Sequence, residues 1–245
     1  MILRLCRVEL LKVRRSLVLL MSLACPLTVI VLVFGLNLRH TAPADMDAEK
    51  WGMLWAGVSA MWSWFMLPLY IALATSLING NEHRHQSWRL MLSLPISRFE
   101  LFAAKALVAA LLMSCAHFTL LAGTSLVIGV LGLFDYPLTG AFAMQASAML
   151  WAAPVAALPI LVFQHALSWR LRTIVPPLAF AVLATFASIY LGRSDYWMYL
   201  PWSYPLMATN ASMEASRQAA LSLALLVTAV AFPLTAWWLG RREVV

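Results

Sequence analysis

The sequence predicts an all-α membrane protein with six transmembrane helices, an N-terminal amphipathic helix and both termini in the cytosol. Of its 245 residues, 63% are hydrophobic and only 11% are charged, whereas soluble domains carry roughly 45–50% apolar and about 25% charged residues. The mean hydropathy is +0.83. This composition excludes soluble enzymes, disordered regulators and nucleic-acid-binding domains. The spans are predicted as helices because a backbone in lipid must satisfy its own hydrogen bonds.

The first segment, Met1–Arg15, is predicted to be an amphipathic helix on the inner leaflet. Ile2, Cys6 and Leu10 share one side of the helical wheel, and the arginines cluster elsewhere. Leu11 lies among the arginines, so the two faces are imperfectly separated. A basic tail that only sets the topology is the alternative.

Six apolar stretches follow, each close to the length of about 20 residues that a span requires. The connections between them leave no room for a second folded domain. We therefore expect a single transmembrane domain over residues 1–245, with spans at 16–38, 53–78, 106–133, 141–167, 174–191 and 219–239.

The distribution of basic residues predicts the orientation. Thirteen of the 17 Lys and Arg residues lie in the N-terminal segment, the second loop, the fourth loop and the C-terminus. Positive residues concentrate on the cytosolic side of membrane proteins. The remaining four, in the opposite connections, are Arg39, Lys50, Arg193 and Arg217.

Aromatic residues mark the predicted outer side, because amphipathic rings prefer the headgroup level. Trp51 and Trp55 stand at the outer end of the second span. Segment 194–208 is rich in Tyr and Trp, and Pro201 and Pro205 divide it. We expect it to be a short re-entrant or interfacial hairpin.

The predicted spans contain no Asp, Glu, Lys or Arg. Lys105 stands at the cytosolic start of the third span, where a lysine can snorkel to the interface. Ion-coupled transporters usually bury ionisable residues, so we expect no coupling through side-chain protonation.

A phosphate-binding P-loop requires Gly-Lys, and none of Lys12, Lys50 and Lys105 follows a glycine. Any ATP hydrolysis is therefore expected on a separate polypeptide, and this chain is not expected to be an enzyme.

The longest cytosolic connection, Asn79–Lys105, contains a short predicted helix that ends before Pro95. Ser97 and Glu100 have the spacing of a capping box for the next helix. The apolar face of the short helix comprises Trp88, Met91 and Leu92.

Two motifs carry a family resemblance. Glu9-Leu10-Leu11-Lys12 precedes the first span, and Leu92-Ser93-Leu94-Pro95-Ile96-Ser97-Arg98 precedes Ala104-Lys105. With the six-span length and the aromatic loop before the last span, these motifs resemble the permease subunits of ABC-2-type transporters over essentially the whole chain. The length and the Trp202–Pro205 run are most similar to the permeases that accompany bacteriocin and lantibiotic immunity pumps.

The resemblance implies a working unit of two permease halves, identical or sister chains, and two cytosolic ATPases that bind ATP and Mg. No cofactor is implied for this chain. Residues 1–15 would form an elbow helix, with Arg4, Arg7, Glu9 and Lys12. Residues 80–92 would form a coupling helix in a groove of the ATPase, and the docking residues would be Glu82, Arg84, Trp88, Arg89, Met91 and Leu92.

The resemblance also implies export across the bacterial cytoplasmic membrane. An amphipathic peptide, drug or lipid-like substrate suits spans without fixed charge, while its identity stays open. Polar groups within spans face protein or a cavity, so the candidate substrate path comprises Trp62, His117, Gln145 and Gln164. Ordinary hydrogen bonding between helices explains the same residues equally well.

The remaining polar residues do not form a recognisable metal site. His83 and His85 lack further ligands, and Asp45, Asp47 and Glu49 lack the pattern of a calcium loop, so no metal site is predicted. A noncatalytic membrane scaffold is the alternative function. The remote alternative is an intramembrane serine protease that uses Ser125 and His165.

Overall fold

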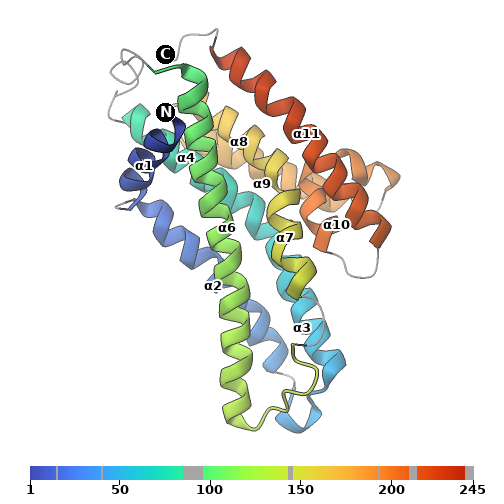
Figure 1. The fold of residues 1–245 in the computed structure, drawn as a ribbon. Coiled ribbons are helices and arrows are strands. Elements are labelled where there is room, and N and C mark those ends of the chain that lie inside the picture. Colours follow the sequence, from blue (N-terminus) through green and yellow to red (C-terminus); the bar gives the residue numbers. More distant parts are fainter. Residues whose placement is uncertain are drawn as a thin grey trace.

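The computed structural model describes residues 1–14, 16–39, 41–84, 96–142, 146–192, 194–209 and 214–240. Every regular element within these residues is helical (Figure 1), which confirms the all-α prediction. Within the described residues, four helical stretches are long and apolar enough to cross a membrane: Leu17–Leu38, Ala48–Arg84, Arg98–Phe134 and Glu214–Leu239.

Helix α1 (Ile2–Val13) lies across one end of the bundle and packs mainly on α6 (Figure 1). Its buried side comprises Leu5, Cys6, Glu9 and Val13, while Leu10 is exposed. The helix is thus amphipathic, but its buried face carries a carboxylate. Helix α2 (Leu17–Leu38) follows and also packs against α6.

The second predicted span belongs to one long helical stretch. It comprises α3 (Ala48–Ala60), a π-helical turn (Met61–Met66) and α4 (Leu67–Arg84). The Asp47 side chain caps its start by accepting a hydrogen bond from the Lys50 backbone N–H at 2.8 Å. A 3₁₀ turn (Pro43–Asp45) precedes it.

Trp51 and Trp55, which are predicted to mark the outer end of the second span, pack inside the protein. Both indoles are buried. Their Nε1–H groups donate to the carbonyls of Pro137 and Ala141, each at 2.9 Å. A buried indole needs an acceptor, and here the loop after α6 supplies it.

Helix α6 (Arg98–Leu131) begins with the predicted capping box, since the Ser97 side chain accepts from the Glu100 backbone and Glu100 reaches back to Ser97. Its 34 residues extend about 51 Å at 1.5 Å per residue, more than the ~30 Å hydrocarbon core of a bilayer. The helix starts eight residues before the predicted span 106–133. A 3₁₀ turn (Gly132–Phe134) follows.

The fourth predicted span, 141–167, is not a single helix. It is divided into α7 (Ala146–Ala156) and α8 (Leu158–Arg170), with a turn at Ala157. Pro154 and Pro159 flank the break, and neither can donate a backbone hydrogen bond to the preceding turn. The fifth predicted span corresponds to α9 (Val175–Leu191), a shorter apolar helix of 17 residues.

Segment 194–208 is mainly helical, and its second half is packed into the protein. It contains 3₁₀ turns at Asp195–Tyr199 and Pro201–Ser203, followed by α10 (Tyr204–Thr209). Helix α10 packs between α7 and α11 (Glu214–Gly240) (Figure 1). Trp202 is only 3% exposed, whereas Tyr196 and Tyr199 are 70% and 73% exposed, so the second half of the segment is internal and the first half lies at the surface.

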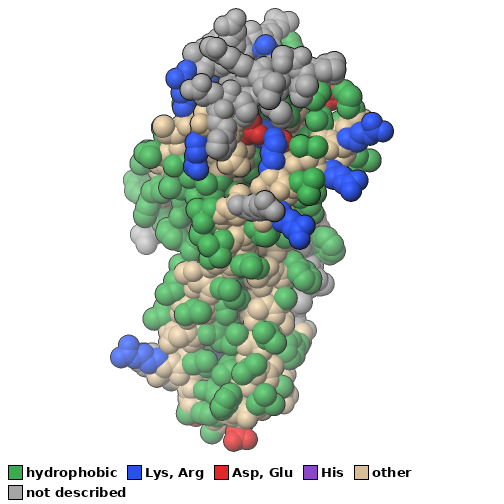
Figure 2. Space-filling model, turned by 90° about the vertical axis from the view of Figure 1, so that its left-hand side faces the viewer, with side chains coloured by type: hydrophobic (Ala, Val, Ile, Leu, Met, Phe, Trp, Pro, Cys, Tyr) green, Lys and Arg blue, Asp and Glu red, His purple; other side chains and the backbone are tan. Residues whose placement is uncertain are grey.

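The two ends of the helical bundle differ in how many charged side chains they carry. Helix α1 and the C-terminal end of α11 lie at the same end (Figure 1). On the face that Figure 2 shows, Lys and Arg gather mainly toward that end, and hydrophobic side chains cover much of the remainder. This separation of charge from apolar surface is typical of a protein that spans a bilayer.

The capping box of α6 makes a first prediction. Ser97→Ala removes the acceptor for the Glu100 N–H and is expected to cost about 0.5–2 kcal/mol of stability, measured by unfolding in detergent. Ser114→Ala is the matched control on the same helix, because this exposed hydroxyl donates only to Ala110 one turn earlier. Equal effects of the two substitutions would contradict a stabilising cap.

Candidate functional site

Four charged side chains form a closed ring at the end of the bundle that carries α1. Lys12 Nζ lies 2.6 Å from Glu9 Oε1 and 2.8 Å from Glu82 Oε1. Lys105 Nζ lies 2.7 Å from Glu9 Oε2 and 2.9 Å from Glu82 Oε2. Each carboxylate therefore bridges two ammonium groups, and the charges around the ring sum to zero. We refer to these four residues as the charge ring.

Three helices supply the charge ring. Glu9 and Lys12 are three residues apart on α1 and so share one face. Glu82 lies in the last turn of α4 and Lys105 two turns into α6. Lys105 Nζ also lies 3.4 Å from the carbonyl oxygen of Ile78 in α4. The charge ring thus holds α1, the end of α4 and the start of α6 together.

Three of the four residues of the charge ring are buried. Glu9 and Glu82 are each 2% exposed and Lys105 is 0% exposed, while the side chain of Lys12 is 33% exposed. Removing an ion from water costs several kcal/mol unless it is paired with good geometry. Burial acts to lower the pKa of Lys12, but its hydrogen bonds to Glu82 and Glu9 outweigh this effect and the pKa is raised. Lys12 therefore stays charged at neutral pH.

Two sequence-based assignments change here. Lys105 does not snorkel to the interface, because its ammonium points into the protein and contacts two carboxylates. The resemblance places Glu82 on the surface that docks an ATPase, but its carboxylate contacts Lys12 and Lys105 inside the charge ring. Sequence position alone cannot tell a lysine that faces lipid from one that faces another helix.

A second polar cluster, which the sequence analysis did not predict, lies next to the charge ring. Asn79 Nδ2 donates to Ser168 Oγ at 2.8 Å and lies 3.1 Å from His165 Nδ1. His165 Nε2 lies 3.1 Å from the carbonyl oxygen of Phe102, which can only accept. His165 therefore carries its proton on Nε2 and accepts from Asn79 on Nδ1. The cluster fastens α8 to α4 and α6.

The contact between His165 and Phe102 also shows that His165 lies far from Ser125, its partner in the protease alternative. His165 lies beside Phe102 of α6, whereas Ser125 is 23 positions further along that helix. At 1.5 Å per residue this corresponds to about 35 Å. A serine and its general base must be within hydrogen-bond reach, so Ser125 and His165 do not form a dyad.

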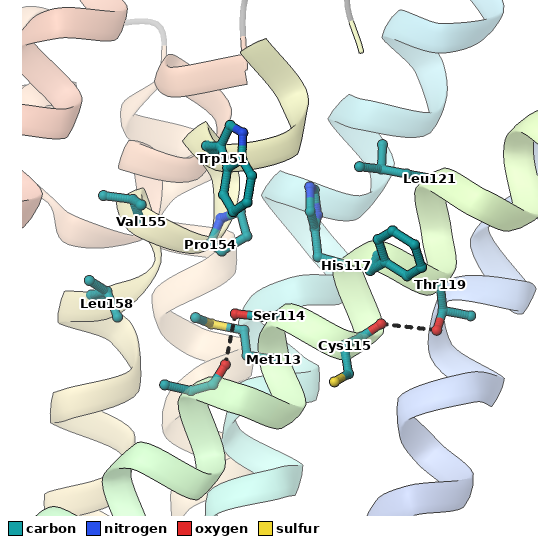
Figure 3. A pocket seen from close by; sticks show the side chains of 12 residues that line it. Met113, Ser114, Cys115, His117, Thr119, Leu121, Trp151, Pro154, Val155 and Leu158 are labelled. Atoms are coloured by element: carbon teal, nitrogen blue, oxygen red, sulfur yellow. Dashed lines mark hydrogen bonds between the residues drawn. The ribbon is translucent and has the colours of Figure 1, made fainter. Parts of the chain in front are cut away.

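Two candidate substrate-path residues do lie together. The rings of Trp62 and His117 are 6.3 Å apart, and both side chains are buried. His117 also lines a cavity of about 640 Å³ between α6 and the α7–α8 pair (Figure 3). Ser114 and Thr119, in the same lining, donate to carbonyls of their own helix (Figure 3). The walls are otherwise mainly apolar, with Phe118 and Trp151 among them.

Gln164 is fully buried on α8, outside that lining, and its side-chain amide has no hydrogen-bond partner within the residues that the structure describes. Gln145 lies outside the described residues.

The remaining predicted site residues are placed as follows. Arg4 and Arg7 are exposed on α1, and Arg84 is exposed at the end of α4. The structure does not describe Trp88, Arg89, Met91 and Leu92. Among the described residues, no group of three or more His, Cys, Asp or Glu side chains could hold a metal ion.

Long apolar helices fastened at one end by buried ion pairs define a polytopic α-helical membrane protein. A family model described as "ABC-2 family transporter protein" matches residues 5–188. The chain therefore belongs to the ABC-2 transporter family, and the resemblance to ABC-2-type permeases is confirmed. The matched range includes all four residues of the charge ring. No curated protein matches the chain.

The charge ring makes a second prediction. Lys105→Met leaves Glu9 and Glu82 buried with only Lys12 between them, and is expected to cost about 3–5 kcal/mol of stability. Adding Glu82→Gln returns the ring to zero net charge and is expected to recover part of the loss. Unfolding in detergent measures both variants in a double-mutant cycle.

Lys50→Met is the matched control, because it removes a lysine outside the charge ring and is expected to change stability by less than about 0.5 kcal/mol. Strictly additive effects of Lys105→Met and Glu82→Gln would show that the two side chains are not coupled.

Proposed function

We propose that this chain is the six-span permease subunit of an ATP-driven ABC exporter in the bacterial cytoplasmic membrane. The membership in the ABC-2 transporter family supports the transport function. In this proposal α7 and α8 together form the fourth span and α9 the fifth. Both termini and the charge ring lie on the cytosolic side, which the bias of Lys and Arg supports.

The energy comes from a separate cytosolic ATPase dimer, which binds ATP and Mg. The chain itself is a transport subunit rather than an enzyme, and a second permease, identical or sister, completes the complex. The ATPase docks on the segment 80–92, with Trp88, Met91 and Leu92 as its apolar contacts.

The observation that carries the coupling mechanism is the charge ring. Glu82 lies two residues before the end of α4 and within the proposed docking segment, ahead of its apolar contacts Trp88, Met91 and Leu92. Its carboxylate binds Lys105 of α6 and Lys12 of α1 at once. A push on the docking segment is therefore transmitted to the elbow helix and the third span together, rather than to α4 alone.

The cavity beside His117 supports a largely apolar, amphipathic substrate. Its walls carry one imidazole against mainly apolar side chains, and the serine and threonine hydroxyls are already bonded to backbone carbonyls. A peptide, drug or lipid-like molecule with a long apolar surface matches this lining. Transport of an antimicrobial peptide for self-immunity is the narrowest form of the proposal, and rests on the resemblance of the Trp202–Pro205 run alone.

The docking segment makes a third prediction. Trp88→Ala combined with Leu92→Ala removes two apolar anchors of the ATPase contact and is expected to lower the ATPase retained by the purified permease roughly tenfold or more. Co-purification in mild detergent measures the ratio of the two proteins, and membrane insertion is expected to stay intact.

Trp151→Ala combined with Leu133→Ala is the matched control, since both side chains are exposed away from this segment, at 75% and 82%. The control is expected to retain the ATPase. Undiminished association of the Trp88/Leu92 variant would place the docking face elsewhere. Purification of the wild-type chain as a homomer without any ATPase would favour a membrane scaffold.

A further inference from the structure

A second cavity, of about 320 Å³, lies between the end of α4 and the connection from α8 to α9. It differs chemically from the cavity beside His117. Its polar side is basic, with His83 and Arg84 from α4 and Arg172 from the connection. No Asp or Glu is among the described residues that line it. We refer to it as the basic pocket.

Ser76 supplies an independent indication of a ligand. This side chain lines the basic pocket, is only 5% exposed, and its hydroxyl has no hydrogen-bond partner within the described part of the chain. Leaving a buried hydroxyl unpaired is unfavourable. An acceptor oxygen of a bound molecule would satisfy it.

We propose that the basic pocket binds the phosphate group of an anionic membrane phospholipid. Two arginines suit phosphate because the planar guanidinium donates paired hydrogen bonds to its oxygens. His83 Nε2 lies 3.0 Å from the carbonyl oxygen of Trp169, which fixes the imidazole at the wall. Basic pockets between membrane helices are a known means of binding lipid headgroups.

The apolar side of the basic pocket favours a lipid over a free anion or an acidic protein surface. Leu77, Leu171 and Ile174 also line it. Ile174 leads directly into α9, whose first residue, Val175, is 68% exposed. A phospholipid presents phosphate and hydrocarbon together, so it matches both sides of the lining. A carboxylate from the ATPase would match only the basic side.

The chain offers a way to block the basic pocket without removing a charge. Gly80 lines it, and a Cβ added there would meet no heavy atom within 4 Å. Gly80→Leu therefore extends into the empty space. Gly35→Leu on α2 is the matched control, because a Cβ there also meets nothing within 4 Å and Gly35 does not line this cavity.

The test measures binding of phosphatidylglycerol to the purified, delipidated full-length chain by native mass spectrometry, with phosphatidylcholine as the neutral comparison. Phosphatidylglycerol is expected to bind more tightly. Gly80→Leu, and separately Arg84→Gln with Arg172→Gln, are each expected to weaken its binding roughly tenfold or more. Gly35→Leu, and Arg39→Gln, which removes an exposed arginine just after α2, are expected to leave binding unchanged.

Inorganic phosphate and glycerol 3-phosphate distinguish the source of the phosphate group. If neither compound displaces phosphatidylglycerol at millimolar concentration, the result supports a lipid ligand. Displacement by both would overturn the lipid assignment in favour of a soluble phosphate. Equal phosphatidylglycerol binding by wild type and both pocket variants would refute the proposal. Loss of ATPase association in the pocket variants with unchanged lipid binding would also refute it and assign the arginines to the ATPase.

Discussion

The charge ring is the constraint on which the charged end of this permease depends. Two carboxylates and two ammonium groups are held within 2.9 Å of their partners, and three of the four are almost completely buried. None of the buried members can be left alone without a large desolvation cost. The geometry of α1, α4 and α6 at this end is therefore fixed by one shared set of ion pairs. Apolar packing alone does not impose so specific an arrangement.

This constraint gives the proposed transport cycle a physical route. Glu82 lies within the segment proposed to receive the ATPase, and the charge ring connects that glutamate to α1 and to α6. The Asn79–His165–Ser168 cluster adds α8 to the same unit. The cavity beside His117 lies further along α6, between this helix and the α7–α8 pair. Motion of α6 relative to α7 would change the shape of that cavity.

The sequence predicts the helices and part of the site, and the misses have definite causes. Hydropathy and the Ser97–Glu100 spacing predict α6 and its cap, because both signals are local. The break at Ala157 is missed because two prolines interrupt a stretch that remains apolar throughout. The ion pair between Glu9 and Lys105 joins residues 96 positions apart, so neither helix alone reveals it. Trp62 and His117 are selected from sequence without any indication that they adjoin each other.

The central claim is that α1, the end of α4 and α6 move as one unit while the ATPase cycles. Spin labels at Leu3 of α1 and Leu107 of α6, which are 82% and 56% exposed, report the distance between the two helices. Pulsed electron spin resonance on the complex with its ATPase compares the nucleotide-free state with the state trapped with ATP and vanadate. The predicted result is a distance distribution that does not change on trapping in the unaltered complex. In the complex with Glu82→Gln, the distribution is expected to broaden. A shift in the otherwise unaltered complex on trapping would contradict the account.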